Sequence, residues 1–186
     1  MKKFITTFFF FSAICLSVYS QSTKDSTALR NQFRITFIHP GVEYEARLNN
    51  SFTASGQAGI GYGGSFKNLS YNLPNGFLYL ISPFVDLQCK YFYNQNKRIR
   101  KQKRTKNNSG NFLSIRFLSR GNTIKSNFER TSNWDYSVGA TWGMQRSYGQ
   151  INLLFDIGPY YYFDGKGNNG VFPLLFQLNI GYNMLK

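Results

Sequence analysis

The stretch Trp134–Tyr148, WDYSVGATWGMQRSY, decides the fold, because its side chains change character at every second position. One parity is large and apolar, interrupted only by Arg146: Trp134, Tyr136, Val138, Ala140, Trp142, Met144 and Tyr148. The other parity is small or polar: Asp135, Ser137, Gly139, Thr141, Gly143, Gln145 and Ser147. Successive side chains of a β-strand point to opposite faces, so the stretch predicts a strand with an apolar wall and a polar wall.

The same alternation recurs after residue 30 and predicts seven strands. They are Gly41–Leu48, Phe52–Gly63, Phe77–Tyr93, Phe112–Ser119, Trp134–Tyr148, Ile151–Phe163 and Phe172–Met184. Their connections alternate between tight turns (49–51 and 149–150) and longer segments rich in Gly, Asn and Ser (64–76, 120–133 and 164–170). Short turns at one end and longer loops at the other are typical of outer-membrane barrels.

An eighth strand is expected because such barrels have an even strand number. Phe33, Ile35 and Phe37 are apolar on odd positions, whereas the apolar set beyond His39 falls on even positions. The change of phase requires a turn or a bulge. A short strand near 31–38 that reverses at Pro40-Gly41 is favoured, and one long bulged strand is the alternative. The predicted fold is all-β: an antiparallel up-and-down transmembrane β-barrel of eight strands over residues 31–186.

The start of the chain has the pattern of a secretory signal. Lys2 and Lys3 precede the apolar run 4–18, and small residues then favour cleavage after Ser20. Residues 1–20 are therefore predicted as a signal peptide and 21–30 as a short N-terminal segment, with a single transmembrane anchor as the alternative. Removal of the signal takes Cys15 away and leaves Cys89, so an intramolecular disulfide is not expected.

The prolines suggest an orientation for the barrel. Proline cannot donate to a strand ladder and belongs near a rim. Pro40, Pro83, Pro159 and Pro173 all fall towards one rim on this strand order. If the C-terminus is periplasmic, that rim faces the outside of the cell.

The polar parity carries charges and glycines that suit a narrow lumen. Its predicted charge network consists of Glu43, Glu45, Arg47, Asp86, Lys90, Arg116, Asp135 and Asp156. Isolated buried charges are very costly, so these groups are expected to pair inside the barrel. The aromatic runs 91–93 and 160–163 lie at opposite strand ends and fit two interfacial girdles, although aromatic residues favour strands in any setting.

Several features together resemble the small outer-membrane β-barrel proteins of the Bacteroidota. They are the signal peptide, the opening Pro40-Gly41-Val42-Glu43-Tyr44-Glu45, the basic segment running into Asn107-Asn108-Ser109-Gly110-Asn111, and a final strand with Gly181-Tyr182. The resemblance covers residues 33–186. It implies a barrel in the outer membrane and brings no catalytic residues.

The residues that could support catalysis have structural interpretations. His39 is the only histidine and lies beside a proline at the predicted turn. Cys89 shares the apolar parity with its neighbours and is expected on the lipid-facing wall. The carboxylates fit a lumen network better than a catalytic pair or a cation site. No catalytic residue, metal site or cofactor is predicted.

A basic run places seven positive charges within ten residues, without an acid among them: Lys97, Arg98, Arg100, Lys101, Lys103, Arg104 and Lys106. Such a run attracts phosphates and carboxylates. Nucleic acid fits poorly with an exported barrel, so membrane lipids and anionic envelope polymers are the candidate partners. A merely solvated hairpin is the alternative.

These observations predict a monomeric, non-enzymatic barrel of the cell outer membrane with a filled polar lumen and a structural or binding role in the envelope. An eight-stranded barrel has room only for its own side chains, which argues against a general pore. Two alternatives stay open: a membrane-embedded lipid-modifying enzyme, and a soluble periplasmic barrel that binds an apolar ligand.

Overall fold

Eight antiparallel strands close into a barrel in the computed structural model, which describes residues 29–63, 79–127, 129–130 and 132–185. The strands are β1 (Gln32–Thr36), β2 (Gly41–Arg47), β3 (Phe52–Gly63), β4 (Leu80–Tyr91), β5 (Gly110–Arg120), β7 (Asp135–Tyr148), β8 (Ile151–Asp164) and β9 (Asn169–Asn183). Each pairs with the next along the chain, and β9 pairs with β1 to complete the ring. The predicted all-β, eight-stranded antiparallel barrel is thus confirmed.

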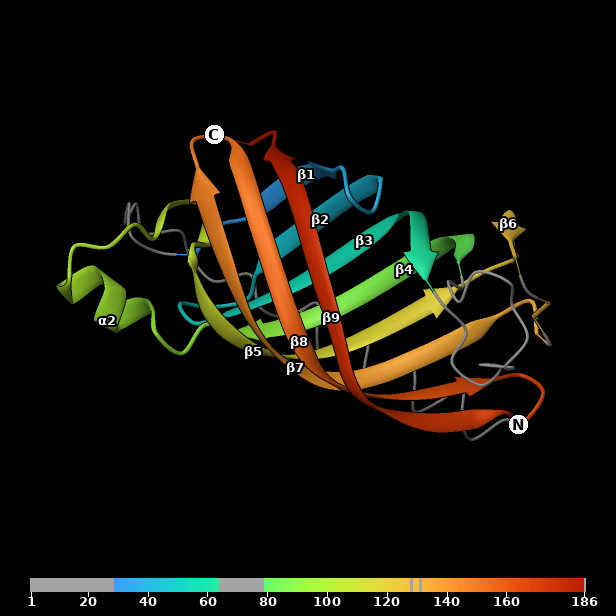
Figure 1. The fold of residues 1–186 in the computed structure, drawn as a ribbon. Helices are drawn as coiled ribbons and strands as arrows, with labels where there is room; N and C mark the ends of the chain where they lie inside the picture. The colour runs from blue at the N-terminus through green and yellow to red at the C-terminus, as the bar shows by residue number, and fades with distance from the viewer. Residues whose placement is uncertain (1–28, 64–78, 128, 131, 186) are drawn as a thin grey trace, which may run out of the picture.

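Three short elements lie outside the ring. The helix α2 (Gln95–Arg100) and the 3-10 turn η1 (Lys106–Asn108) connect β4 to β5, and β6 (Lys125–Ser126) extends the pairing of β4 beyond β5. Figure 1 shows α2 beyond one end of the barrel and β6 at the opposite end. Among the residues described, no helix is long and apolar enough to cross a membrane.

The first hairpin explains the change of phase in the sequence. β1 ends at Thr36, which is paired with Gly41 at the start of β2, and residues 37–40 make the turn between them. The Thr36 hydroxyl donates a hydrogen bond to the His39 carbonyl oxygen at 2.7 Å, which holds the turn closed. The chain therefore reverses before Gly41, as favoured, and the alternative of one long bulged strand is wrong.

Most predicted strand bounds lie within three residues of the observed ones. The bounds of β3 coincide with the prediction, whereas β5 and β9 begin earlier than expected. Residues 77 and 78 of the predicted third strand lie outside the described residues, as do the predicted signal peptide and residues 21–28. Leu29 and Arg30 are described: Leu29 is buried, and Arg30 is hydrogen-bonded to Asn108.

A register shift divides β9 into two parts. Gly158 of β8 pairs with Leu175, but Tyr160 pairs with Phe172, so β9 holds one residue more than β8 between these pairs. Such a bulge reverses which parity faces outward. Val171 is exposed before the shift, and Phe176 and Leu178 are exposed after it. The single alternation predicted for 172–184 is therefore wrong before the bulge.

The barrel is polar inside and apolar outside. In β4 the outward residues are Val85, Leu87, Cys89 and Tyr91, and the side chains between them are buried and polar. In β7 the two parities of the sequence fall on the two walls as expected, with Trp142 and Met144 outside and Ser137 and Thr141 inside. Far more of the described buried side chains are polar or charged than apolar.

Glycines let large aromatic rings fit inside this narrow lumen. Gly143 of β7 is the direct cross-strand neighbour of Phe112 in β5, and Gly139 is the neighbour of Tyr160 in β8. A Cβ atom at Gly143 would lie 2.3 Å from Cζ of the Phe112 ring and 2.8 Å from the Phe155 carbonyl oxygen. The small residues of the polar parity thus make room for Phe112 and Tyr160.

We expect Gly143→Ala to lower the free energy of unfolding by about 1–3 kcal/mol, because overpacking moves neighbouring rings and backbone. Gly170→Ala is the control, since a methyl group there would meet nothing within 4 Å and the φ of Gly170 is not in the left-handed region. Urea unfolding of the two variants compares their stability. Equal stability of the two variants would contradict this packing of the lumen.

The two ends of the barrel differ in their connections. The proline rim comprises the turn 37–40, the described part of 121–134 and the turn 165–168. The basic rim comprises the turns 48–51 and 149–150 together with 92–109. Four buried apolar residues lie at the basic rim: Leu29, Phe92, Phe112 and Leu154. They form the apolar core cluster of the described residues.

Candidate functional site

The lumen near the basic rim holds a four-membered charge cluster. Arg34 contacts Glu43 at 3.1 Å (Nη1 to Oε1) and Glu45 at 2.5 Å (Nη2 to Oε2). Lys90 Nζ lies 3.4 Å from Glu43 Oε1 and 4.0 Å from Glu45 Oε1. Thr53 donates a further hydrogen bond to Glu45 at 2.7 Å. Because all four charged side chains are buried, each ion depends on its partners for compensation.

A second cluster lies deeper in the lumen around Arg116. Its guanidinium binds both carboxylate oxygens of Asp86 and contacts Asp156 Oδ1 at 3.2 Å. Arg116 Nη1 also donates to the Tyr160 hydroxyl at 3.0 Å, and Gln88 Nε2 donates to Asp156 Oδ2 at 3.2 Å. One arginine from β5 thereby joins carboxylates from β4 and β8 across the barrel.

Asp135 forms the third cluster, near the proline rim. Arg120 Nη1 lies 3.7 Å from its Oδ1, and Arg130 Nη2 lies 2.7 Å from its Oδ2. Arg130 comes from the connection between β5 and β7 and also donates to the Gly121 carbonyl oxygen at 2.7 Å. The cluster therefore ties this connection to the barrel.

Of the eight residues expected in the lumen network, the structure brings seven into these clusters. Arg47 is placed elsewhere: it lies at the last position of β2, half-buried, and its guanidinium binds Asn50 in the adjacent turn. Arg47 has the parity of the lumen-facing residues, as predicted. Because it lies at the end of the strand, its side chain reaches the rim instead of the lumen.

Arg34, Arg120 and Arg130 are the basic partners that sequence reasoning missed. Arg34 alternates with Phe33 and Ile35, and Arg120 shares the parity of Arg116, so the period-two pattern could have found both. Arg130 reaches Asp135 from a connection without periodicity, and no sequence signal placed it there. With these three, five carboxylates and five cations form the ion pairs of the three clusters.

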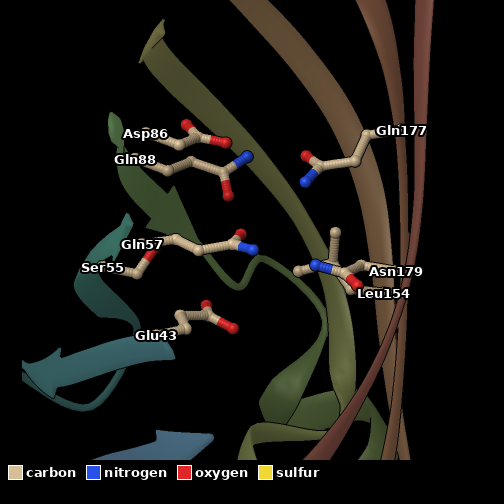
Figure 2. A pocket seen from close by; sticks show the side chains of 8 residues that line it. All are labelled: Glu43, Ser55, Gln57, Asp86, Gln88, Leu154, Gln177 and Asn179. Atoms are coloured by element: carbon tan, nitrogen blue, oxygen red, sulfur yellow. The ribbon is translucent and has the colours of Figure 1, made fainter. Parts of the chain in front are cut away.

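A small polar cavity remains between the first two clusters. Figure 2 shows Glu43, Gln57, Asp86 and Gln88 on one side, pointing towards Gln177 and Asn179 on the other. The space open to the centre of a water molecule is about 10 Å³, which is close to the minimum for one water. The buried Asn179 Oδ1 lining it has no hydrogen-bond partner among the described groups. The cavity suits an isolated water rather than an organic ligand.

The basic segment 92–109 is folded against the rim. Asn107 and Asn108 are buried, the Asn108 side chain binds both backbone groups of Arg30, and Ser109 Oγ accepts from the Ser147 amide at 2.9 Å. All but one of the seven predicted basic residues are exposed, and Arg98 is half-buried. The second half of the segment is tied to β7 and to the N-terminal residues, whereas most of its charges are exposed, so the solvated hairpin stays open as an alternative to a bound anionic partner.

His39 lies in the turn at the proline rim among aromatic side chains. Its ring packs edge-on against Phe84, with centroids 6.0 Å apart, and tilts towards Tyr62 at 6.4 Å. The buried Nδ1 of His39 forms no hydrogen bond with any of the residues that the structure describes. Burial, and then the positive charge of Arg116, lower the pKa of His39, and a hydrogen bond to the Tyr62 backbone and the charge of Asp86 only partly oppose this.

The lowered pKa predicts a loss of stability in mildly acidic solution. Above the ordinary histidine pKa of about 6.5, His39 is neutral in both states, and below it the unfolded chain takes up the proton first. We therefore expect unfolding to become easier as the pH falls from about 7 to 5.5, before most carboxylates titrate. His39→Gln should flatten this dependence in urea titrations. If the stability of the variant depends on pH as steeply as that of the wild type, groups other than His39 cause the effect.

Cys89 is exposed on the outer wall, as its parity predicted. No group of three or more His, Cys, Asp or Glu side chains in the described part of the chain is placed to hold a metal ion.

Comparisons with protein-family models, with curated proteins and with solved structures found no match. The resemblance to the Bacteroidota barrels therefore stays a prediction from the sequence.

Proposed function

We propose that this chain is a non-enzymatic outer-membrane β-barrel, monomeric, with a filled polar lumen and a structural or binding role in the cell envelope. The observation that carries the proposal is the reversal of polarity across the barrel wall. Ile115 is 67% exposed and Phe176 is 72% exposed, whereas Arg34 and Lys90 are fully buried. Contiguous apolar surface of this extent is rare on proteins that are monomeric in water, and it matches the lipid-facing band of a membrane barrel.

The interior supports a closed barrel rather than a general pore. Arg116 bridges β4, β5 and β8 through Asp86 and Asp156, and the buried apolar cluster around Phe112 lies at the basic rim. A narrow barrel of eight strands is normally filled by its own side chains in this way. A soluble barrel that binds an apolar ligand would instead need an apolar interior, which these charge clusters do not provide.

Cell fractionation combined with gel mobility tests the proposal. Membrane barrels of this type commonly stay folded in detergent until they are boiled, because the closed ring leaves no strand edge from which to open. We expect the chain in the outer-membrane fraction, with different mobility before and after boiling. Recovery as a soluble periplasmic protein would contradict the proposal. An envelope lipid whose presence requires both the protein and His39 would favour the lipid-modifying enzyme.

The orientation adds a topological prediction. If the C-terminus is periplasmic, the basic rim lies in the periplasm, because β9 ends there. Lys101 and Lys103 are exposed and should react with a membrane-impermeant amine reagent only after the outer membrane is permeabilised. Lys166, in a turn of the proline rim, is the internal control and should react on intact cells. Labelling of Lys101 on intact cells would reverse the orientation.

A further inference from the structure

The outer surface of the basic rim carries three arginines gathered around one tyrosine. Arg104 lies over the Tyr148 ring, with its Cζ 5.6 Å from the ring centroid. Arg98 donates two hydrogen bonds to the Arg104 carbonyl oxygen, at 2.7 and 3.1 Å. Arg146 lies two residues before Tyr148 on the outward parity of β7, close enough to Arg98 for the two charges to repel. The basic run of the sequence and the one interruption of the apolar stripe therefore meet at a single place.

Hydrogen bonds to backbone carbonyl oxygens and to one side-chain amide hold these guanidinium groups in position. Arg104 Nη1 donates to the Ser147 carbonyl oxygen at 2.8 Å. Arg146 Nη1 donates to the carbonyl oxygens of Gly110 at 2.7 Å and Gln145 at 2.8 Å, and Nη2 donates to Asn111 Oδ1 at 2.5 Å. Neutral acceptors fix the geometry of a cation without compensating its charge.

The cluster has no acidic partner among the described residues. The ion pairs of the described chain join the lumen carboxylates to other cations, and none includes Arg98, Arg104 or Arg146. Gathering three positive charges on one surface is unfavourable unless an anion binds there. The cluster is thus organised for an external anion.

The surroundings indicate the source of that anion. Trp142 and Tyr93 lie on the same outer wall, where the indole Nε1 donates to the Tyr93 hydroxyl at 2.9 Å. Tyr148 is 61% exposed on the same wall. Exposed tyrosine rings at strand ends, such as those of Tyr93 and Tyr148, are enriched at the headgroup level of a membrane, where lipid phosphates lie. Arginine binds phosphate with a planar fork of donors, which makes it suited to this ligand.

We propose that Arg98, Arg104 and Arg146 bind the phosphate of an anionic phospholipid in the leaflet that meets the basic rim. This rests on the proposed function, because the lipid reaches the site only if the wall is in a membrane. The proposal also gives the basic segment a specific role. Arg98 and Arg104 of this segment hold the lipid, whereas its more exposed cations contribute only a screened, general attraction.

Native mass spectrometry of the full chain in uncharged detergent tests the site. Phosphatidylglycerol is the lipid probe, diacylglycerol is the uncharged comparison and inorganic phosphate is the free anion. The test variant is R98Q/R104Q/R146Q. The matched control is K97Q/R100Q/K101Q, which removes the same number of charges from exposed positions of the same segment.

We expect wild type to retain phosphatidylglycerol in preference to diacylglycerol and to keep it in the presence of equimolar inorganic phosphate. Loss of charge-assisted hydrogen bonds should weaken retention roughly tenfold or more in the test variant. The control should change it by less than about twofold, because exposed charges contribute little. Equal weakening by both triple variants would overturn the site in favour of diffuse attraction. Displacement by inorganic phosphate would overturn the lipid as the ligand.

Arg104→Gln alone keeps the proposal testable if the triple variant does not fold, because this exposed side chain lies outside the strands. It should weaken lipid retention while leaving the boiling-dependent gel mobility unchanged. Unchanged retention in this folded variant would contradict the proposal. Failure of wild type to show the mobility change would instead contradict the barrel's membrane setting, so the two failures are distinguishable.

Discussion

Replacing Arg116 by methionine should lower the free energy of unfolding by about 3–5 kcal/mol, because it leaves buried carboxylates without their cation. Arg116 is the shared partner of Asp86 and Asp156, and no other cation forms an ion pair with either one among the described residues. The change removes charge while keeping a long side chain in the lumen. Urea unfolding in lipid vesicles, followed by gel mobility without boiling, measures the loss.

Two further variants serve as comparisons for this measurement. The triple variant R116M/D86N/D156N removes the charges together and should recover a large part of the lost stability, since buried pairs can often be replaced at little cost. Arg47→Gln, which alters an arginine outside the clusters, should change stability by no more than about 0.5 kcal/mol. A loss in Arg116→Met no larger than in Arg47→Gln would contradict the lumen network.

The second large effect concerns the outer wall. If the outer wall faces lipid, Leu178→Arg should destabilise the barrel in lipid by about 2–4 kcal/mol, because the change places a charge on that wall away from the rims. Leu178 is 47% exposed near the middle of β9. On a protein surrounded by water, an arginine at such an exposed position would change stability by only about 0.5 kcal/mol.

Met184→Arg is the matched control for this prediction. Met184 has the same parity as Leu178, follows the last residue of β9 and is 49% exposed at the basic rim. Arginine there should cost only about 0–1 kcal/mol, because the interface solvates it. Similar small effects at both positions would show that the apolar wall does not face lipid.

The sequence predicted the parts of the barrel that depend on alternation. Period two in Trp134–Tyr148 identified the strand and assigned each residue to its wall, because a closed barrel has one inside and one outside along its whole length. The same rule placed Asp86 and Lys90 in the lumen and Cys89 outside. These predictions needed no knowledge of which strands pair.

Other features depend on relations that alternation does not contain. The bulge in β9 inserts one residue relative to β8, and Pro173 within it is equally compatible with the start of a strand, so alternation alone does not predict the change of phase. The contact between Arg130 and Asp135 depends on the path of a connection. The arginine cluster depends on residues 98–104 folding back over Tyr148, which brings distant positions together. From the sequence, only the basic run and the isolated Arg146 could be recognised, and not their proximity.

Quenching of Trp142 by lipids with brominated acyl chains tests the membrane setting most directly. Trp134→Phe leaves Trp142 as the only tryptophan of the chain. Trp142 lies on the outer wall near the middle of β7 and is 40% exposed. If this wall faces lipid, its emission should be strongly quenched by bromines on the acyl chains and little by iodide in the aqueous phase. Strong quenching by iodide, without quenching by the brominated lipids, would contradict a lipid-facing wall.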